Sequence, residues 1–272
     1  MKTLNIGLVC TTLLASAALA NDNIVIDGST TLGPIAKAFA EYYRGANPSV
    51  NITISESGSG NGVKSLLNGT CDVAPISRPL TSSEFTAAAS NEKQPIAHVV
   101  ALDGVSMLVH PSNPVQDLTV EQVRKIYLGE YTNWKLVGGP DKEIITISRD
   151  NNSGTFETFQ MKVMNGANVR SDCEVVNSNG AARQRVQNTT GAVAYVGIGF
   201  VDSSVKALRI NGVHASVETV KSGQYPIARP LYMYTNGYPA FGSHLYHYMT
   251  LHFSRDGQQI ISEIGFIPLT EY

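Results

Sequence analysis

The chain has 272 residues, with 20 lysines and arginines against 22 aspartates and glutamates, and a formal net charge of −2 at pH 7. This balance excludes a strongly basic surface, so nucleic acid and anionic membranes are poor partners. The length allows one or two domains with a large core, and Gly, Ser, Thr and Asn are spread along the chain, so we expect an ordered protein.

The first twenty residues, MKTLNIGLVCTTLLASAALA, have the pattern of a secretory signal peptide. A lysine near the start is followed by an apolar stretch, and an Ala-Leu-Ala sequence at the end provides an A-x-A cleavage site. The uncharged run is short for a membrane span. We therefore expect a signal peptide at 1–20 and export of the remaining 252 residues. Cys10 is an imperfect lipoprotein cysteine, because Gly7 stands where leucine is usual.

Short β-prone runs alternate with amphipathic segments along the mature chain. The expected strands are 24–26, 50–54, 71–76, 143–148, 174–176 and 192–200, and the expected helices lie within 35–48, 62–69, 118–134, 149–163, 181–188 and 244–269. Strands separated by helices of this length pair in parallel, so the turns at their carboxyl ends share one edge of the sheet. The pattern predicts an open α/β sheet, and such sheets bind ligands at that edge.

Two longer apolar runs, 98–111 and 228–236, interrupt this alternation. The first is longer than a typical strand and can pass from one domain to another, and the second can cross back. We therefore expect two α/β lobes joined by two crossing strands. Residues 21–103 and 229–272 would form the first lobe, and residues 104–228 would form the second.

Three predicted strand-to-helix turns share one chemistry: Gly-Ser-Thr-Thr at 28–31, Gly-Ser-Gly-Asn-Gly at 58–62 and Ser-Arg-Asp-Asn-Asn-Ser-Gly-Thr at 148–155. Each offers hydroxyl donors, and its glycines let backbone N–H groups approach a ligand at a helix N-terminus. Arg149 adds a planar fork of donors that suits a tetrahedral oxyanion. Taken singly, each turn is better explained as an ordinary helix cap. Together they predict a site for an oxyanion.

The second turn also approaches the spacing of a nucleotide-binding loop, G-x-x-x-x-G-K-[ST], through Gly58, Lys64 and Ser65. Val63 occupies the position that this motif reserves for glycine, and ATP is not available to an exported protein. We therefore interpret Lys64 as a solvated residue of the helix and reject the nucleotide reading.

The mature chain contains two cysteines, Cys71 and Cys173. In an oxidising compartment the first expectation is a disulfide. The predicted lobes place one cysteine at the start of a strand in each lobe, at the end that points away from the shared edge. We therefore favour two buried thiols.

An enzyme is the first alternative function. A serine hydrolase would need a G-x-S-x-G elbow or a similar one, and the sequence has none. His244 and His247 stand three residues apart, but no H-E-x-x-H motif or nearby acid supports a metal site. We expect no catalytic residues, no metal and no cofactor, and we expect Trp134 to pack in the core.

The chain resembles the short phosphate-binding proteins of Pst-type ABC transporters over nearly all of its mature length. The motifs that carry the resemblance are DGSTTLGPIAKAF, ESGSGNGVKSL, CDVAPISRPL, SRDNNSGTFETF, TGAVAYVGIGFVD and YPIARPLYMYT. The resemblance implies a two-lobed type II periplasmic binding protein with a two-strand hinge. Phosphate would lie dehydrated between the lobes, and a monomeric protein in the periplasm would deliver it to a permease in the inner membrane.

The matching motifs also imply which residues bind the ligand. These are Ser29, Thr30, Thr31, Ser59, Ser77, Arg149, Ser153, Gly154 and Thr155. Ser77 departs from the family, because many members carry an aspartate there that accepts the proton of hydrogen phosphate. Asp103, Glu56 and Asp27 are the possible substitutes for that acid.

Several alternatives stay open at this point. Arg78 could bind the ligand or pair with an acid such as Asp72. The serine at position 77 also leaves open a binder of another oxyanion such as sulfate, because a site made only of donors does not select for a protonated ligand. A surface or adhesion protein built on the same fold is a further alternative.

Overall fold

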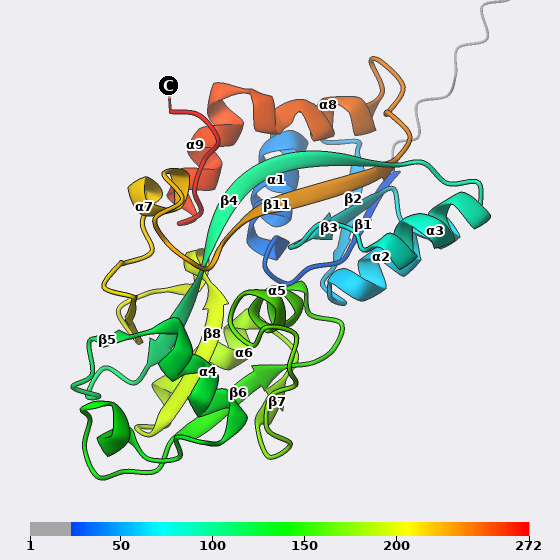
Figure 1. Ribbon diagram of the computed structural model, residues 1–272. Helices are drawn as coiled ribbons and strands as arrows, with labels where there is room; N and C mark the ends of the chain where they lie inside the picture. Colours follow the sequence, from blue (N-terminus) through cyan, green and yellow to red (C-terminus); the bar gives the residue numbers. More distant parts are fainter. Residues whose placement is uncertain (1–22, 272) are drawn as a thin grey trace, which may run out of the picture.

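The computed structural model describes residues 23–271, so the predicted signal peptide lies outside the described residues (Figure 1). The strands are β1 (Asn23–Asp27), β2 (Asn51–Ser55), β3 (Val73–Ile76), β4 (Pro95–Val109), β5 (Asp117–Leu118), β6 (Ile145–Arg149), β7 (Glu174–Val176), β8 (Ala192–Gly197), β9 (Lys206–Ala207), β10 (Arg209–Ile210) and β11 (Ala228–Asn236). The α-helices are α1 (Gly33–Ala46), α2 (Ser59–Asn68), α3 (Ser82–Ser90), α4 (Val120–Leu128), α5 (Gly154–Lys162), α6 (Asn179–Gln187), α7 (Val217–Lys221), α8 (His244–Thr250) and α9 (Arg255–Glu263). Short 3-10 helices occupy Trp134–Val137, Ile198–Phe200 and Leu251–Phe253.

A mixed sheet runs through the molecule in the order β2-β1-β3-β11-β4-β8-β6-β7, with β9 added beside β4. The predicted parallel pairs are present, because β1 lies parallel to β2 and β3, and β6 lies parallel to β7 and β8. The two crossing strands, β4 and β11, lie antiparallel to each other, and each is antiparallel to its outer neighbour. The α/β fold class is therefore confirmed.

Strand β4 belongs to both halves of this sheet and confirms the prediction of a long crossing strand. Its first part, Pro95–Gly104, pairs with β11, and its last part, Val105–Val109, pairs with β8. In Figure 1 the strand passes from the group of β1–β3, α1 and α8 into the group of α4–α6 and β6–β8. The register of β11 on β4 shifts between Leu231 and Tyr232, opposite Ala101 and Val99 of β4.

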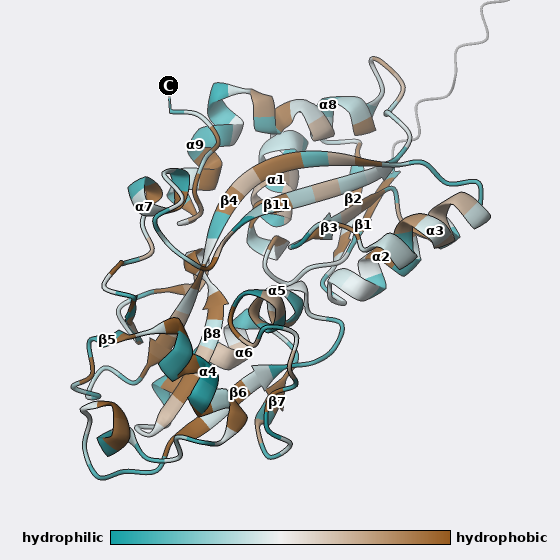
Figure 2. Cartoon of the chain, in the orientation of Figure 1, coloured by the Kyte–Doolittle hydropathy of each residue, from teal (hydrophilic) through white to brown (hydrophobic). Residues whose placement is uncertain are grey.

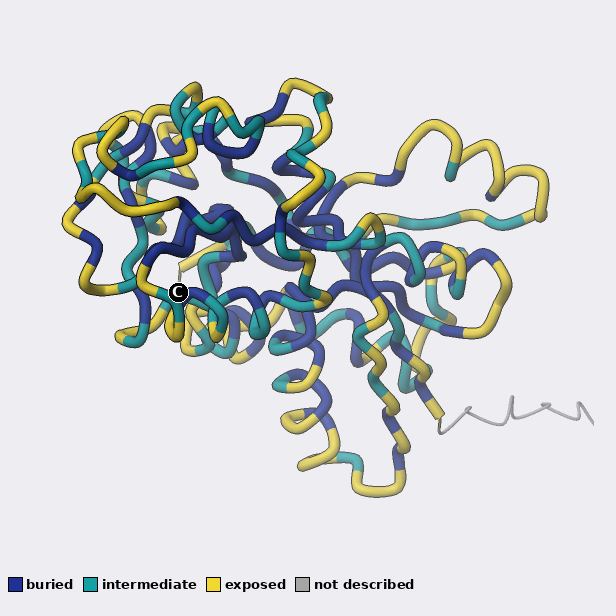
Figure 3. The backbone as a smooth tube through the Cα atoms, turned by 90° about the horizontal axis from the view of Figure 1, so that it is seen from below, coloured by how far each residue is buried: buried dark blue, intermediate teal, exposed yellow. Residues whose placement is uncertain are grey.

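Each group of elements has its own core. Phe39 of α1 packs with Tyr248 of α8 over the β1–β3 side of the sheet. On the other side, Phe159 of α5 stacks on Tyr195 of β8 with ring centroids 4.0 Å apart. Trp134 is fully buried in the same cluster, which confirms its expected place in the core. Figure 2 shows apolar colour along the strands, and Figure 3 shows the buried segments gathered in the centre of the molecule.

The two cysteines are free and buried, as we favoured from the sequence. Cys71 lies in the cluster under α2, whereas Cys173 lies in the core around Trp134, 3.2 Å from Thr146 Oγ1. Burial raises the pKa of Cys71 to about 12, so this thiol is protonated and unreactive at neutral pH.

Some helices differ from the prediction. Helix α2 begins at Ser59 and α6 begins at Asn179, so each includes residues that we had assigned to a polar turn. Gly58 makes the early start of α2 possible, because its φ of +100° is a conformation that favours glycine. Helices α3 and α7 were not predicted. Helix α3 buries only Ala88 and α7 buries only Val220, so neither sequence shows an apolar stripe.

No helix among residues 23–271 combines the length and the apolar character that crossing a bilayer requires.

His252 makes stability depend on pH. Its ring is 2% exposed, and Nδ1 donates to the carbonyl of Met249 at 2.6 Å. The pKa of this imidazole is lowered to about 4, mainly by burial and to a smaller extent by the nearby His98, while the hydrogen bond to Met249 opposes the change. Between about pH 6.5 and pH 4 this histidine is protonated in the unfolded chain but neutral in the folded chain. The free energy of unfolding therefore decreases as the pH falls through this window.

We expect His252→Gln to reduce the loss of unfolding free energy between pH 7 and pH 4.5 by about 2 kcal/mol, measured by urea unfolding at each pH. His110, which is only partly buried on the β4–β5 connection, provides the control. An unchanged slope in His252→Gln, or an equal change in His110→Gln, would show that His252 is not the responsible group.

Candidate functional site

Four helices begin at one place in the structure, namely α1, α2, α5 and α6. The Oγ1 atom of Thr31, just before α1, lies 3.0 Å from the Oγ1 atom of Thr155, in the first turn of α5. Asn179, the first residue of α6, donates to Thr31 Oγ1 at 3.0 Å. Gly154 lies against Ser59, the first residue of α2. Since a helix N-terminus carries partial positive charge and free N–H groups, this junction suits an anion.

The structure brings the predicted site residues to this junction and buries all of them. They are Ser29, Thr30, Thr31, Ser59, Ser77, Arg149, Ser153, Gly154 and Thr155. Two of them also serve local structure. Ser153 Oγ caps α5 by accepting from Phe156 N at 3.2 Å, and Ser29 Oγ accepts from Thr31 N at 3.1 Å.

Arg149 enters the junction from the end of β6. Its Nε and Nη2 donate to the carbonyls of Val176 and Asn177 at 3.1 and 3.0 Å, and Nη2 also donates to Thr30 Oγ1 at 3.2 Å. The remaining nitrogen, Nη1, is buried without a hydrogen-bond partner in the described chain. Burial lowers the pKa of this guanidinium, and the charge of Arg229 lowers it further, although Asp150 partly offsets them. A bound anion would supply both the missing acceptor and the missing charge.

Sequence reasoning missed Arg229, which lies at the start of β11 and is 4% exposed. Its Nε and Nη2 contact Asp103 Oδ2 at 2.8 and 2.7 Å, which makes a buried ion pair between the two crossing strands. An arginine in an otherwise apolar strand was the available signal, because a buried charge requires a partner.

The other donors of Arg229 connect the loops of the junction. Nη1 donates to the carbonyls of Ser77 and Gly154 at 3.0 and 3.2 Å, and Nη2 donates to Thr155 Oγ1 at 3.0 Å. One guanidinium therefore joins the loop after β3 to the first turn of α5. With Arg149 and Asp103 it leaves the junction with two buried cations and one buried anion.

Asn179 was also missed, because the segment NSNG was interpreted only as a turn. It is fully buried, and its amide contacts Thr30, Thr31 and the backbone of Gly197. This is a fourth strand-to-helix turn with the chemistry of the other three, and its Ser-Asn-Gly run after β7 was the available signal.

None of the three acids considered as substitutes for the family aspartate has a free carboxylate at the junction. Asp103 accepts from Ile198 N at 2.8 Å in addition to Arg229. Asp27 accepts from two serine hydroxyls at 2.6 Å, and Glu56 pairs with Lys37. The acceptor that remains is the hydroxyl of Ser77, which lies 3.2 Å from Ser59 Oγ.

Arg78 pairs with Glu84 and Glu157, and not with Asp72 as we had considered. It is bidentate to Glu84 with both distances at 2.8 Å, and its Nε contacts Glu157 on α5. Burial raises the pKa of Glu157, and Arg78 opposes that rise. Since Arg78 follows β3, this ion pair bridges the two groups of elements beside the junction.

Gly154 provides a test of how closely the loops meet. A Cβ atom at this position would lie 2.5 Å from Ser59 Oγ and 2.6 Å from Ser77 Oγ. We expect Gly154→Ala to weaken binding of an oxyanion by about 5- to 150-fold, because overpacking of this kind costs about 1–3 kcal/mol. Titration calorimetry measures the effect.

Gly180→Ala is the matched control, because a Cβ there would meet only Ser178 Oγ at 4.0 Å. Both glycines lie in the first turn of a helix at the junction. Equal affinities for the two variants would contradict the close approach of the loops.

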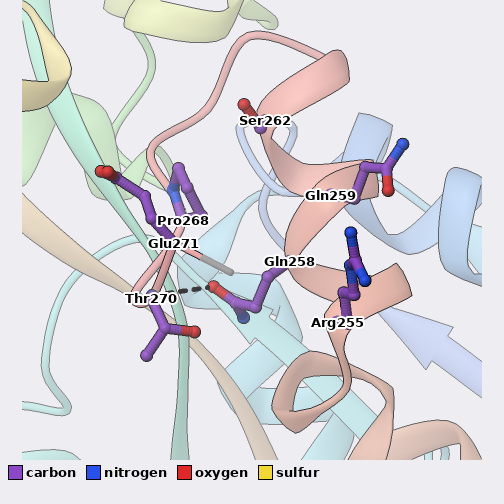
Figure 4. Close-up of a pocket in the computed structure, with 7 residues that line it drawn as sticks. All are labelled: Arg255, Gln258, Gln259, Ser262, Pro268, Thr270 and Glu271. Atoms are coloured by element: carbon purple, nitrogen blue, oxygen red, sulfur yellow. Dashed lines mark hydrogen bonds between the residues drawn. The ribbon is translucent and has the colours of Figure 1, made fainter.

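A separate hollow of ≈ 250 Å³ lies between α9 and the C-terminal segment (Figure 4). Gln258 is buried beside it and accepts from the backbone N–H groups of Leu269 and Thr270 at 2.6 and 3.3 Å. The hollow contains none of the predicted site residues, and Gln258 holds the C-terminal segment against α9.

Comparison with known proteins agrees with this geometry. A family described as "PBP superfamily domain" matches residues 15–251. The phosphate-binding protein PstS of Borreliella burgdorferi is 32% identical, over 92% of this chain and 91% of its own length. PstS of Bacillus subtilis is 29% identical, over 93% and 82%.

Solved structures show the same fold. A phosphate ABC transporter substrate-binding protein from Clostridium perfringens, solved with bound phosphate, has a TM-score of 0.83 at 31% identity, covering 91% of this chain and 100% of that one. An ABC-type phosphate transport receptor from Vibrio cholerae has a TM-score of 0.73 at 32% identity, covering 90% and 99%. The chain therefore belongs to the PBP superfamily and, within it, to the PstS family of phosphate-binding proteins.

Proposed function

We propose that this chain captures inorganic phosphate in the periplasm and delivers it to the permease of an ABC transporter in the inner membrane. It is a solute-binding protein and not an enzyme. The observation that carries the proposal is the unpartnered Nη1 of Arg149, buried where four helix N-termini and several hydroxyl groups meet. The predicted signal peptide at 1–20 supports export, and we expect the exported protein to act as a monomer.

The nine predicted residues are the proposed phosphate ligands. Hydroxyl groups and backbone N–H groups at the starts of α1, α2 and α5 would replace the water around the ion. Arg149 Nη1 would supply a charge-assisted bond. Arg229 is added to this set as a support, since its donors hold Thr155 and the carbonyls of Ser77 and Gly154.

Capture would involve closure of two lobes, made of residues 21–103 with 229–272 and of residues 104–228. The hinge would lie near Ala101–Ser106 and Ala228–Tyr232. The change of partner along β4 and the register shift in β11 fall within these segments and support the proposal. The bridges from Arg229, Asn179 and Arg78 to the opposite group would form as the lobes close, and a permease would recognise the closed form.

Sulfate is the second candidate ligand. The engaged carboxylates of Asp103, Asp27 and Glu56 favour it, because none of them is free to accept the proton that distinguishes hydrogen phosphate from sulfate. Only the hydroxyl of Ser77 would perform that selection.

Titration calorimetry of the ligand-stripped mature chain with phosphate, sulfate and arsenate, from pH 5 to 8.5, tests both candidates. Tight phosphate binding that sulfate does not compete with would support the proposal and assign the acceptor role to Ser77. Binding of both anions would mean that Ser77 relaxes the selectivity. The absence of heat with every oxyanion would refute the function.

A further inference from the structure

The side-chain amide of Asn179 has only one possible orientation. The residue is fully buried, and one of its amide atoms lies 3.2 Å from the backbone nitrogen of Gly197. A backbone N–H can only donate, so the amide oxygen must face Gly197 and the NH₂ group must face the other way. Both hydrogens of that NH₂ group are used, one on Thr30 Oγ1 at 3.1 Å and one on Thr31 Oγ1 at 3.0 Å.

This orientation determines where the hydroxyl hydrogen of Thr30 points. A hydroxyl oxygen has two lone pairs and one hydrogen. Thr30 Oγ1 accepts from Asn179 Nδ2 and from Arg149 Nη2 at 3.2 Å, so both of its lone pairs are engaged. Its hydrogen has no acceptor among the described residues, although the side chain is buried. The group is therefore held as an unused donor at the junction.

The same accounting applies to Thr31 and Thr155, whose Oγ1 atoms are 3.0 Å apart. Asn179 donates to Thr31, and Arg229 Nη2 donates to Thr155 at 3.0 Å. Whichever threonine donates to the other, the receiving oxygen then has both lone pairs engaged. Its own hydrogen is left over, so the pair also presents one unused donor.

We propose that Asn179 is a positioning residue for phosphate binding, which sets the hydroxyls of Thr30 and of the Thr31–Thr155 pair as donors to the anion. This inference rests on the proposed function and adds a determinant of ligand charge. With Arg149 Nη1, the two hydroxyl hydrogens form a set of donors, which favours the doubly charged form of phosphate over the form that carries an extra proton.

Asn179→Asp tests the proposal because it keeps the shape of the side chain and reverses its polarity. One carboxylate oxygen would still accept from Gly197 N, and the other would accept from the threonine hydroxyls. Their lone pairs would then face the ligand. The charged groups that face this cluster, Arg149, Arg229 and Asp103, are unchanged in the variant.

The experiment is a phosphate titration of the full mature chain at pH 8 and at pH 5.5, where more of the phosphate carries the extra proton. Compared with the wild type, Asn179→Asp is expected to lose about 10- to 100-fold in affinity at pH 8 and distinctly less at pH 5.5. Asn188→Asp is the control for charge alone, since Asn188 is exposed at the C-terminal end of the same helix, α6, away from the threonines. We expect it to change affinity by less than about threefold at both pH values.

Three results would overturn the inference. They are an equal loss for Asn179→Asp at both pH values, the same pH dependence in Asn188→Asp, and unchanged affinity in Asn179→Asp. If thermal unfolding shows that Asn179→Asp does not fold, a double-mutant cycle of Asn179→Ala with Thr30→Val replaces it. If the losses of phosphate affinity in the two single variants are coupled, the inference is supported. If they add independently in the double variant, the inference is overturned. A wild-type chain that does not bind phosphate would refute the proposed function itself, and the inference with it.

Discussion

Arg149→Ala is expected to remove tight phosphate binding and to leave the chain folded. The guanidinium is 3% exposed, and its Nη1 has no partner in the described chain. A hydrogen bond to a charged group contributes about 1.5–3 kcal/mol, and this arginine can direct more than one donor at the ligand. We therefore expect a loss of at least about 100-fold in affinity, measured by titration calorimetry.

The fold should tolerate this change, because it removes a buried charge that lacks a counter-ion when no ligand is present. Phosphate should raise the melting temperature of the wild type but not that of Arg149→Ala, since only a ligand that binds the native state stabilises it. Arg183→Ala is the control, because Arg183 pairs with Asp202 on the surface of α6. Retained affinity in Arg149→Ala would refute the assignment of the site.

The second large effect is expected from the ion pair of Arg229 and Asp103. Both side chains are buried, with Asp103 at 0% exposure, so removing one partner leaves the other charge uncompensated. We expect Arg229→Leu or Asp103→Leu to lower the free energy of unfolding by about 3–5 kcal/mol, measured by urea denaturation. Arg229→Leu should also bind phosphate weakly, because Thr155 loses the donor that orients its hydroxyl.

The double variant separates these two effects. Arg229→Leu combined with Asp103→Leu removes both charges and should recover much of the lost stability, since an apolar pair can replace a buried ion pair at little cost. It should not recover phosphate affinity. Breaking the exposed pair of Arg183 and Asp202 by the same substitutions should cost less than about 1 kcal/mol. Equal costs for the buried and the exposed pair would show that burial adds nothing to the ion pair of Arg229 and Asp103.

The sequence by itself determined the elements and the type of site. A short β-prone run predicted β1, alternating apolar residues predicted β2 and a long apolar run predicted β4, because these patterns depend only on local residues. Glycine and hydroxyl residues after the strands predicted where ligand-facing turns lie. The motif that ends in Ser153, Gly154 and Thr155 indicated a strand-to-helix turn, and in the structure that turn lies between β6 and α5.

The tertiary structure alone decided which charged and polar side chains meet. Arg229 and Thr31 are 198 residues apart, Asn179 and Thr30 are 149 apart, and both contacts lie in one buried junction. Arg78 forms ion pairs with Glu84 and Glu157 and not with Asp72. The partner of a hydrogen bond depends on which distant segments pack together and on how much water they exclude. Neither can be predicted from the neighbouring residues in the sequence. The arrangement of the candidate site therefore follows from how the crossing strands bring the two groups of elements together.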